Sequence, residues 1–209
     1  MTTPFFSIVV VWYEGTQGYG VLRNALSSIP QDKSLCEVIV MHDGPIKSAA
    51  KENIPADLVL FTKNRYNDWG HTPKHMAIPT CRGEYIIWLN ADNMIYPHAL
   101  RHAKDRLEQL NKPKVAFFPV LMEGYNQYIT KDASYGWYDQ PRDPSKAAVL
   151  NGIPLVIGNV DLMCGVIRTE VWKACGWWDK AIDSDFTIFK KLATEHGSNY
   201  VNVLLGIHR

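Results

Sequence analysis

Short apolar runs alternate with helical segments along the first half of the chain. The runs are rich in β-branched and aromatic residues, which is typical of strands buried on both faces, and they span 5–12, 37–41, 58–61, 85–89 and 115–120. Helical spacing or a Thr-Pro start predicts helices at 19–29, 72–80 and 97–110. Because strands and helices alternate, the pattern predicts a parallel sheet with right-handed crossovers.

The last of these helices should bury one face, formed by Leu100, Ala103, Leu107 and Leu110. From about residue 122 to 154 the pattern weakens, and we expect short strands or a functional flap there. Beyond it we expect strands at 156–157, 162–167 and 200–205, a helix at 169–175, and a helix that follows 183–185 and ends at Gly197. The chain contains no repeat or linker, so the sequence predicts one α/β domain over residues 1–209.

Composition and charge exclude several classes of protein. The 209 residues carry a net charge of +1, which does not favour binding to nucleic acid or to an anionic membrane. No apolar run approaches the roughly 18 to 20 residues of a transmembrane segment, and the start Met-Thr-Thr-Pro does not resemble a signal peptide. The four cysteines are scattered without a CxxC pair. We therefore expect reduced thiols and a cytoplasmic protein.

A polar cluster follows the apolar strand at 85–89. Asn90-Ala91-Asp92-Asn93 supplies oxygen ligands at the carboxyl end of that strand, where open α/β sheets bind their ligands. Oxygen donors favour Mg²⁺ or Mn²⁺ over zinc, and such an ion would hold a diphosphate. Asn and Asp also favour turns, so this stretch alone is equally consistent with a plain turn.

Acidic residues follow three of the predicted strands. Glu14, Asp43 and Asp92 should line one edge of the sheet. Close carboxylates repel one another and raise a pKa unless a cation lies between them. Asp43 taken singly is better explained by an Asp-Gly turn, but three acids together favour a site for a metal ion or a cationic ligand.

Further motifs follow in order along the chain: Val11-Trp12-Tyr13-Glu14, His42-Asp43-Gly44, Pro73-Lys74-His75-Met76-Ala77, Asn90-Ala91-Asp92-Asn93, Gly176-Trp177-Trp178-Asp179 and Asp183-Ser184-Asp185. In this order they resemble the motifs of family 2 glycosyltransferases with the GT-A fold. The order carries the resemblance, because no motif is intact: Lys74 replaces an Arg, and Ser184 stands where a Glu is usual. The resemblance implies a single Rossmann-like domain with a mostly parallel central sheet, helices on both faces and a small antiparallel acceptor-side part. About 1–120 would bind the nucleotide, and about 121–209 would face the acceptor.

The resemblance also implies roles for individual residues. The donor-binding residues would be Val11, Tyr13, Glu14, Asp43, Lys74, Asn90, Ala91 and Asp161. Tyr13 and Asp43 would hold the base, and Asp43 can accept from the imide of uracil. Asp92 and His208 would bind Mn²⁺ or Mg²⁺. Asp185 would be the catalytic base, with Asp183 as its rival. Stacking on an acceptor is assigned to Trp137, Tyr138, Trp177 and Trp178.

The implied activity is metal-dependent, inverting transfer of a sugar from a nucleotide diphosphate sugar, with UDP-sugar favoured, to a carbohydrate or other hydroxyl acceptor. Two alternatives remain at this point. A nucleotidyltransferase should show a Gly-rich loop with a basic residue after the first strand, and residues 15–20 contain no Lys or Arg. A non-catalytic nucleotide- or carbohydrate-binding module would keep the pocket but not the base. A dehydrogenase is disfavoured because Gly15-Thr16-Gln17-Gly18 does not match GxGxxG.

Overall fold

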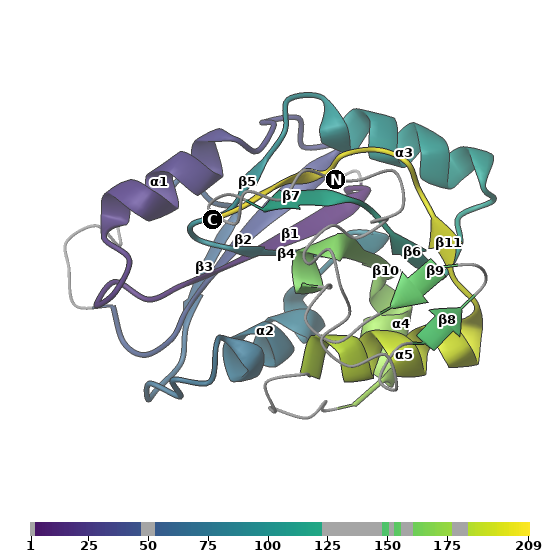
Figure 1. The fold of residues 1–209 in the computed structure, drawn as a ribbon. Helices are drawn as coiled ribbons and strands as arrows, with labels where there is room; N and C mark the ends of the chain where they lie inside the picture. Colours follow the sequence, from purple (N-terminus) through teal and green to yellow (C-terminus); the bar gives the residue numbers. More distant parts are fainter. Residues whose placement is uncertain (1–2, 47–52, 123–147, 151–152, 156–160, 177–183) are drawn as a thin grey trace.

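A mixed, mostly parallel sheet forms the centre of the protein (Figure 1). The computed structural model describes residues 3–46, 53–122, 148–150, 153–155, 161–176 and 184–209. Within these residues the sheet has seven strands in the order β11-β6-β10-β4-β1-β2-β3. Their bounds are β1 (Phe6–Trp12), β2 (Cys36–His42), β3 (Leu58–Phe61), β4 (Tyr85–Asn90), β6 (Val115–Phe117), β10 (Gly165–Arg168) and β11 (Asn199–Tyr200).

The sequence pattern of the central strands has a direct structural cause. Every residue of β1 and β2 is buried, and β1 pairs in parallel with both β2 and β4. A strand covered on both faces needs a nearly continuous apolar run, and this is what the chain carries. The predicted α/β fold with its mostly parallel sheet is therefore confirmed.

Helices cover both faces of this sheet (Figure 1). One face carries α1 (Tyr19–Ser27) and α3 (Ala99–Gln109), and the other carries α2 (His71–Ala77), α4 (Thr169–Ala174) and α5 (Ser184–His196). The inward face of α3 consists of Leu100, Ala103 and Leu107, whereas Leu110 lies at the end of the helix and is 38% exposed, contrary to our prediction. Among the described helices none has the length and apolarity needed to cross a membrane.

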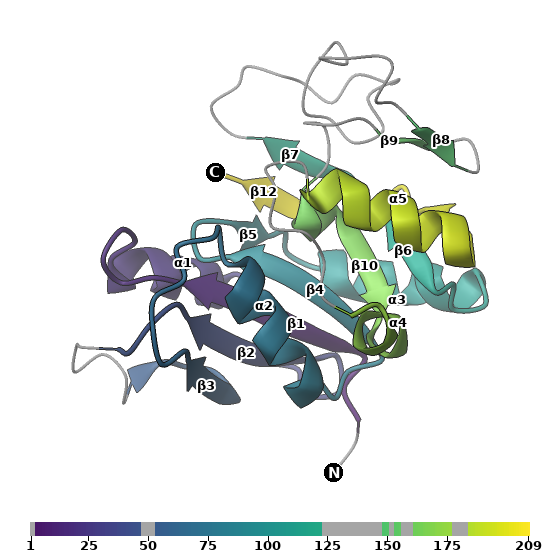
Figure 2. The same cartoon turned by 90° about the horizontal axis from the view of Figure 1, so that it is seen from below.

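Two small sheets complete the described part of the chain. β12 (Gly206–His208) pairs antiparallel with β5 (Met94–Ile95) and parallel with β7 (Val120–Met122), as Figure 2 shows from below. β8 (Ala148–Leu150) and β9 (Ile153–Leu155) form an antiparallel pair. A Cβ atom at Gly206 would lie 2.1 Å from the Met94 carbonyl oxygen, so only glycine allows β12 to approach β5 this closely. The return of β12 places the C-terminal residues directly beside the turn that follows β4.

Several local predictions were wrong. The segment predicted as a strand at 162–167 begins as a 3₁₀ helix, η4 (Leu162–Cys164), because the Asp161 carboxylate accepts a hydrogen bond from the Met163 N–H and caps that turn. The run at 115–120 is divided between β6 and β7, which belong to different sheets. Of the run at 200–205, Tyr200 ends β11, and residues 201–205 form no strand before β12 begins. At 162–164 and 201–205 apolar residues outside a strand produced the same pattern as a strand, whereas the residues of β6 and β7 do pair but with strands of different sheets.

A buried polar network ties β1, β2 and β4 together at their amino ends. Glu37 is buried, with 3% of the residue exposed. Its carboxylate accepts hydrogen bonds from the Ser7 hydroxyl at 2.6 Å, from the backbone N–H of Arg82 at 2.6 Å and from Nε of Arg82 at 2.7 Å. The Gly83 N–H donates to the Ser7 hydroxyl at 2.8 Å. A Cβ atom at Gly83 would lie 2.3 Å from the Ser7 nitrogen, so the close approach requires glycine.

Candidate functional site

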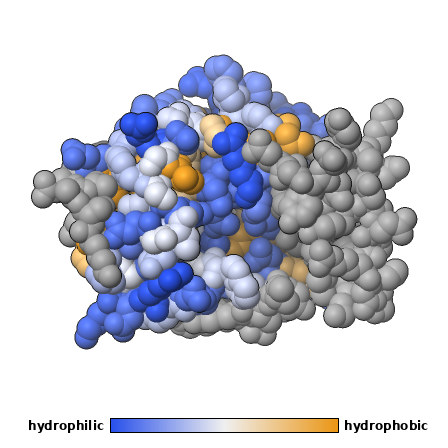
Figure 3. All heavy atoms as spheres, turned by 60° about the vertical axis from the view of Figure 1, so that its left-hand side comes forward, coloured by the Kyte–Doolittle hydropathy of each residue, from blue (hydrophilic) through white to orange (hydrophobic). Residues whose placement is uncertain are grey.

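The carboxyl ends of β1, β2 and β4 enclose a cavity of about 510 Å³. Parallel pairing sets Val11 beside both Met41 and Asn90, so the residues after each strand come together. The cavity is lined by Val11, Trp12, Tyr13, Thr16, Gln17, Asp43, Arg65, Asn67, Trp69, Gly70, Asn90 and Asp92. Figure 3 brings this side of the molecule forward and shows mostly hydrophilic residues around a hollow. Five of the predicted site residues therefore share one cavity.

Asp43 organises the loop between β3 and α2. Its carboxylate is buried and accepts hydrogen bonds from the Tyr66 N–H at 2.8 Å and the Asn67 N–H at 3.0 Å. Gly44 has a φ of +105°, so the Asp-Gly turn considered from the sequence is present as well. A carboxylate has about four lone-pair positions, and within the described part of the chain these two N–H groups occupy two of those on Asp43, so the others are available to a ligand in the cavity.

His42 is a structural residue that the sequence analysis did not identify. It is fully buried, and its Nε2 accepts a hydrogen bond from the Glu14 N–H at 3.0 Å. Its Nδ1 lies 2.7 Å from the Gly44 carbonyl oxygen, which can only accept, so the proton is on Nδ1. The neutral ring thereby links the loops that follow β1 and β2. The only available signal was its place in the His42-Asp43-Gly44 motif.

The turn after β4 holds Asp92 toward the cavity. The Asn93 N–H donates to the Asn90 carbonyl at 3.0 Å, which closes the turn. Oδ2 of Asp92 accepts from the Gln17 amide at 3.0 Å, while its buried Oδ1 accepts no hydrogen bond from any residue that the structure describes. A buried carboxylate oxygen without a donor has the chemistry of a cation ligand.

His208 lies in β12 and forms an ion pair with Asp161, with Nε2 3.4 Å from Oδ2. Burial lowers the pKa of His208, but the hydrogen bond and charge of Asp161, together with Asp92, raise it above its ordinary value. Burial likewise raises the pKa of Asp161, but His208, the Met163 N–H and Lys74 hold it below the usual range. The two predicted residues are thus partners in one charged cluster.

The donor set at this edge fits a divalent cation only in part. Within the described part of the chain, no group of three or more His, Cys, Asp and Glu side chains gathers in a way that would hold a metal. Asp92 and His208 would supply two ligands, one of them the buried Oδ1 oxygen of Asp92. Mg²⁺ and Mn²⁺ commonly take one or two protein ligands and complete their shell with water and substrate phosphates. The residues present therefore fit an ion that binds together with a diphosphate.

Asp185 lies in the first turn of α5. Its Oδ2 accepts from the Leu162 N–H at 3.2 Å, and the Ser184 hydroxyl lies 3.4 Å from its Oδ1. Burial and the negative charge of Asp161 raise the pKa of Asp185 to about 7, although Lys74 and these two hydrogen bonds lower it. A carboxylate with a pKa near neutral pH is suited to taking and releasing a proton. Its rival, Asp183, lies outside the described residues.

Lys74 connects the cavity to the acidic cluster. This buried residue of α2 donates from Nζ to the Trp69 carbonyl at 3.3 Å, and its positive charge lowers the pKa of both Asp161 and Asp185. Gly70, with φ +80°, precedes the helix, and a Cβ atom there would lie 2.7 Å from Val11 Cγ1. The helix therefore starts against the end of β1 and carries the lysine into the site.

The start of α2 differs from the prediction. We predicted a helix that starts with Thr72-Pro73, but Gly70 is the N-cap residue and Pro73 lies in the third helical position. The Thr72 N–H and hydroxyl both donate to the Asp68 carboxylate, with the hydroxyl contact at 2.6 Å. The Asp68 carboxylate thus accepts a hydrogen bond from an N–H of the first turn that has no partner within the helix. The helix accordingly begins at His71, before the predicted start at Thr72.

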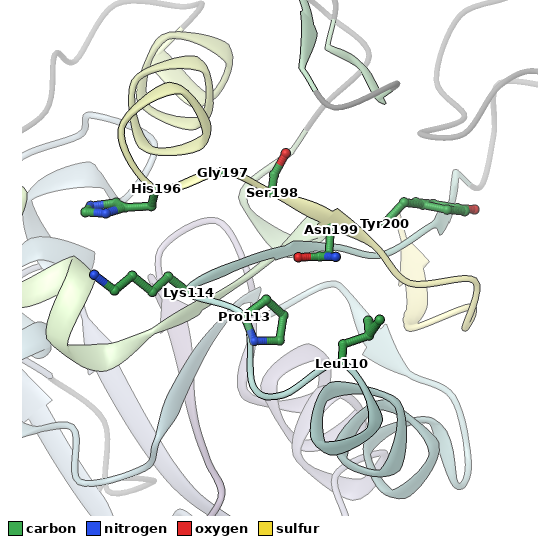
Figure 4. A pocket seen from close by; sticks show the side chains of 8 residues that line it. All are labelled: Leu110, Pro113, Lys114, His196, Gly197, Ser198, Asn199 and Tyr200. Carbon is green, nitrogen blue, oxygen red and sulfur yellow. The ribbon is translucent and has the colours of Figure 1, made fainter.

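A second cavity of about 510 Å³ lies elsewhere, where α3 and α5 end beside β11 (Figure 4). It is lined by Leu110, Pro113, Lys114, His196, Gly197, Ser198, Asn199 and Tyr200, none of which is a predicted site residue. The predicted acceptor residues Trp137, Tyr138, Trp177 and Trp178 lie outside the described residues. Of the remaining predicted residues, Glu14 and Ala91 lie in the loops that border the first cavity.

Comparison with known proteins identifies relatives of this chain. The family model described as glycosyl transferase family 2 matches residues 7–165. An uncharacterised glycosyltransferase of Rickettsia bellii is 25% identical over 198 residues, which cover 90% of this chain and 27% of the relative. The structure of Staphylococcus aureus TarS 1-349 in complex with UDP matches with a TM-score of 0.70 and 17% identity. The match covers 100% of this chain and 60% of the TarS chain. The structure of the same protein in complex with UDP-GlcNAc matches with a TM-score of 0.69 and 15% identity, and the match covers 100% of this chain and 58% of the TarS chain. The chain thus spans about a quarter of the curated relative's length, and the structural likeness confirms the fold.

Proposed function

The chain belongs to glycosyl transferase family 2, and from this premise we propose that it transfers a sugar from a nucleotide diphosphate sugar to a hydroxyl group, with inversion at the anomeric carbon. One observation carries the proposal. The cavity at the strand ends lies next to the buried Lys74, and the charge of Lys74 also acts on Asp185, a partly buried carboxylate whose pKa is raised to about 7. A UDP-sugar is the favoured donor, because Asp43 faces the cavity as an acceptor for an imide N–H and TarS, a structural relative, binds UDP and UDP-GlcNAc.

Donor binding is assigned to the strand ends. Tyr13 and Asp43 border the end of the cavity where the base would lie, and Glu14 follows in the same loop. Val11, Asn90 and Ala91 would face the ribose. Asp161 would contact the sugar, since its carboxylate lies in the charged cluster with His208 and Lys74. We further propose that about 1–120 of the domain bind the nucleotide and that about 121–209 face the acceptor, with Asp161 reaching the donor sugar from the second half.

The departing diphosphate would meet positive charge from two sources. Lys74 is buried beside the cavity and would act as a point charge on the phosphate oxygens. Asp92 and His208 would hold Mn²⁺ or Mg²⁺ together with the diphosphate. When bound, the ion neutralises charge that develops as the diphosphate leaves.

Asp185 would be the base for the acceptor. An acceptor oxygen attacks the anomeric carbon from the face opposite the diphosphate, and the bond from that carbon to the phosphate oxygen breaks. The electron pair of that bond leaves with the diphosphate, and the acceptor proton moves to the carboxylate of Asp185. Trp137, Tyr138, Trp177 and Trp178 remain our candidates for stacking on a carbohydrate acceptor.

Calorimetric titration tests the donor and metal assignments. UDP and GDP are each titrated with and without Mn²⁺ into the wild-type chain, into Asp92→Ala, and into a control variant, Asp105→Ala. Asp105 is an exposed residue on α3. We expect micromolar binding of UDP that needs Mn²⁺, is preserved in Asp105→Ala and is lost in Asp92→Ala. Metal-independent binding would remove Asp92 and His208 as metal ligands, and failure to bind either nucleotide would contradict the proposed activity.

A further inference from the structure

Trp69 is an exposed aromatic residue on the wall of the donor cavity. The residue is 71% exposed, although large apolar residues are normally buried, and it lines the cavity together with Asp43 and Asn67. It belongs to the loop between β3 and α2, the same loop that Asp43 holds through the Tyr66 and Asn67 N–H groups. An exposed indole in a polar cavity offers a flat face to a ligand.

The backbone holds this indole in place. Trp69 has a φ of +52°, a left-handed conformation that is rare for a bulky residue, and Gly70 follows at +80°. The Trp69 carbonyl accepts the hydrogen bond from Lys74, and the preceding Asp68 carboxylate binds the first turn of α2. Contacts on both sides therefore fix a conformation that the chain alone disfavours, and such conformations cluster at ligand-binding sites.

The other aromatic rings of the cavity are already covered. Trp12 is 1% exposed, and its ring packs edge-on against His42. The Arg65 guanidinium lies over the Tyr13 ring, 3.7 Å from the ring centroid. A Cβ atom at Gly15 would lie 2.5 Å from the same ring, so the Gly15 backbone packs closely against it as well. Among the described residues that line the cavity, Trp69 is thus the aromatic side chain with its ring open.

We propose that Trp69 stacks on the nucleobase of the donor, while Asp43 contacts the edge of that base. The inference rests on the proposed function and adds a binding residue that the sequence motifs did not indicate. Stacking on the base is favoured over stacking on the transferred sugar because the cavity that Trp69 lines includes Asp43 but excludes Asp161 and Asp185. A planar base between an indole face and a carboxylate acceptor uses both its π-face and its hydrogen-bonding edge.

The test compares two ligands that share phosphates but differ in the base. UDP and inorganic pyrophosphate, each with Mn²⁺, are titrated into the wild-type chain and into Trp69→Ala, Trp69→Phe and Tyr66→Ala. Tyr66 is a matched control, because it lies on the same loop, is 45% exposed and does not line the cavity. We expect Trp69→Ala to weaken UDP binding about 5- to 150-fold and to leave pyrophosphate binding unchanged. Trp69→Phe and Tyr66→Ala should bind UDP within about threefold of the wild type, since a phenyl ring still stacks.

Two results would overturn the inference. Equal UDP affinity in Trp69→Ala would show that no stacking occurs, and an equal loss of UDP and pyrophosphate would show that the residue acts only through Lys74. Fluorescence gives a second measurement, because UDP should quench indole emission in the wild type and less in Trp69→Phe. If the wild-type chain binds no nucleotide, the proposed function fails first, whereas wild-type binding with an unaffected Trp69→Ala refutes the stacking alone.

Discussion

Replacing Asp185 by Asn should stabilise the protein while removing its activity. The pKa of Asp185 is raised from 3.8 to about 7, chiefly by burial and then by the charge of Asp161. A raised pKa means that the folded chain holds this proton more tightly than the unfolded chain does. The stabilisation is therefore complete below pH 3.8 and is lost as the pH rises through about 7.

The size of this effect follows from linkage. A difference of about 3 pKa units corresponds to roughly 4 kcal/mol of unfolding free energy once the group is fully ionised. Between pH 5 and pH 8 the wild type should lose about 2 to 3 kcal/mol through this group, and Asp185→Asn should not lose it. The amide keeps the size of the side chain but weakens the charge-assisted hydrogen bond from the Leu162 N–H, so the net gain at pH 8 should be about 1 to 3 kcal/mol.

Urea unfolding at pH 5 and pH 8 measures this difference. The exposed Asp105→Asn serves as the control and should change neither value by more than about 0.5 kcal/mol. Sugar transfer should fall about 10²- to 10⁴-fold in Asp185→Asn, with UDP binding retained. A stability difference that does not grow with pH would refute the burial argument. Unchanged transfer would refute the base assignment, and a wild-type chain that binds UDP without any transfer would favour a non-catalytic module.

Three further predictions test the site and its support. The rate of transfer should rise as the pH passes through about 7, because Asp185 acts only when ionised. In Asp161→Asn this rise should occur at lower pH, because the substitution removes a neighbouring negative charge. pH profiles of kcat/KM measure both effects. Gly83→Ala should destabilise the chain by about 3 kcal/mol or more in urea unfolding, because its Cβ atom would lie 2.3 Å from the Ser7 nitrogen; stability close to the wild type would contradict the close approach. Glu37→Gln should cost about 2 to 3 kcal/mol, because it weakens the bonds to Ser7 and Arg82, without changing UDP affinity; a weaker UDP titration would show that the network reaches the site.

The local pattern of apolar residues was sufficient to predict the parallel strands at the centre of the fold. The apolar runs at 5–12, 37–41 and 85–89 correspond to strands covered on both faces, and burial on two faces leaves a continuous apolar signal. Because parallel strands end at the same edge, the sequence alone predicts that the residues that follow them, Asp43 and Asp92, share one site, and both line the cavity.

The second half of the chain was harder to predict for a physical reason. Its strands are short, and apart from the β8–β9 pair they pair with distant segments, so the sequence periodicity carries little information about which residues form them. The 3₁₀ turn at 162–164 depends on the Asp161 side chain, which the apolar run conceals. The division of 115–120 between two sheets depends on β12 arriving from the far end of the chain.

By itself the sequence determined the class of fold, the edge of the sheet that carries the site and the residue types available there. Only the tertiary structure decided which of them meet: β12 carries His208 to Asp161, and α2 carries Lys74 between the cavity and Asp185. It also showed that Arg65 covers Tyr13 and that Trp69 is exposed on the cavity wall. Hydrophobic periodicity indicates which face of each segment is buried. The ion pairs, the side-chain pKa values and the exposure of aromatic rings depend instead on neighbours that are remote in the sequence.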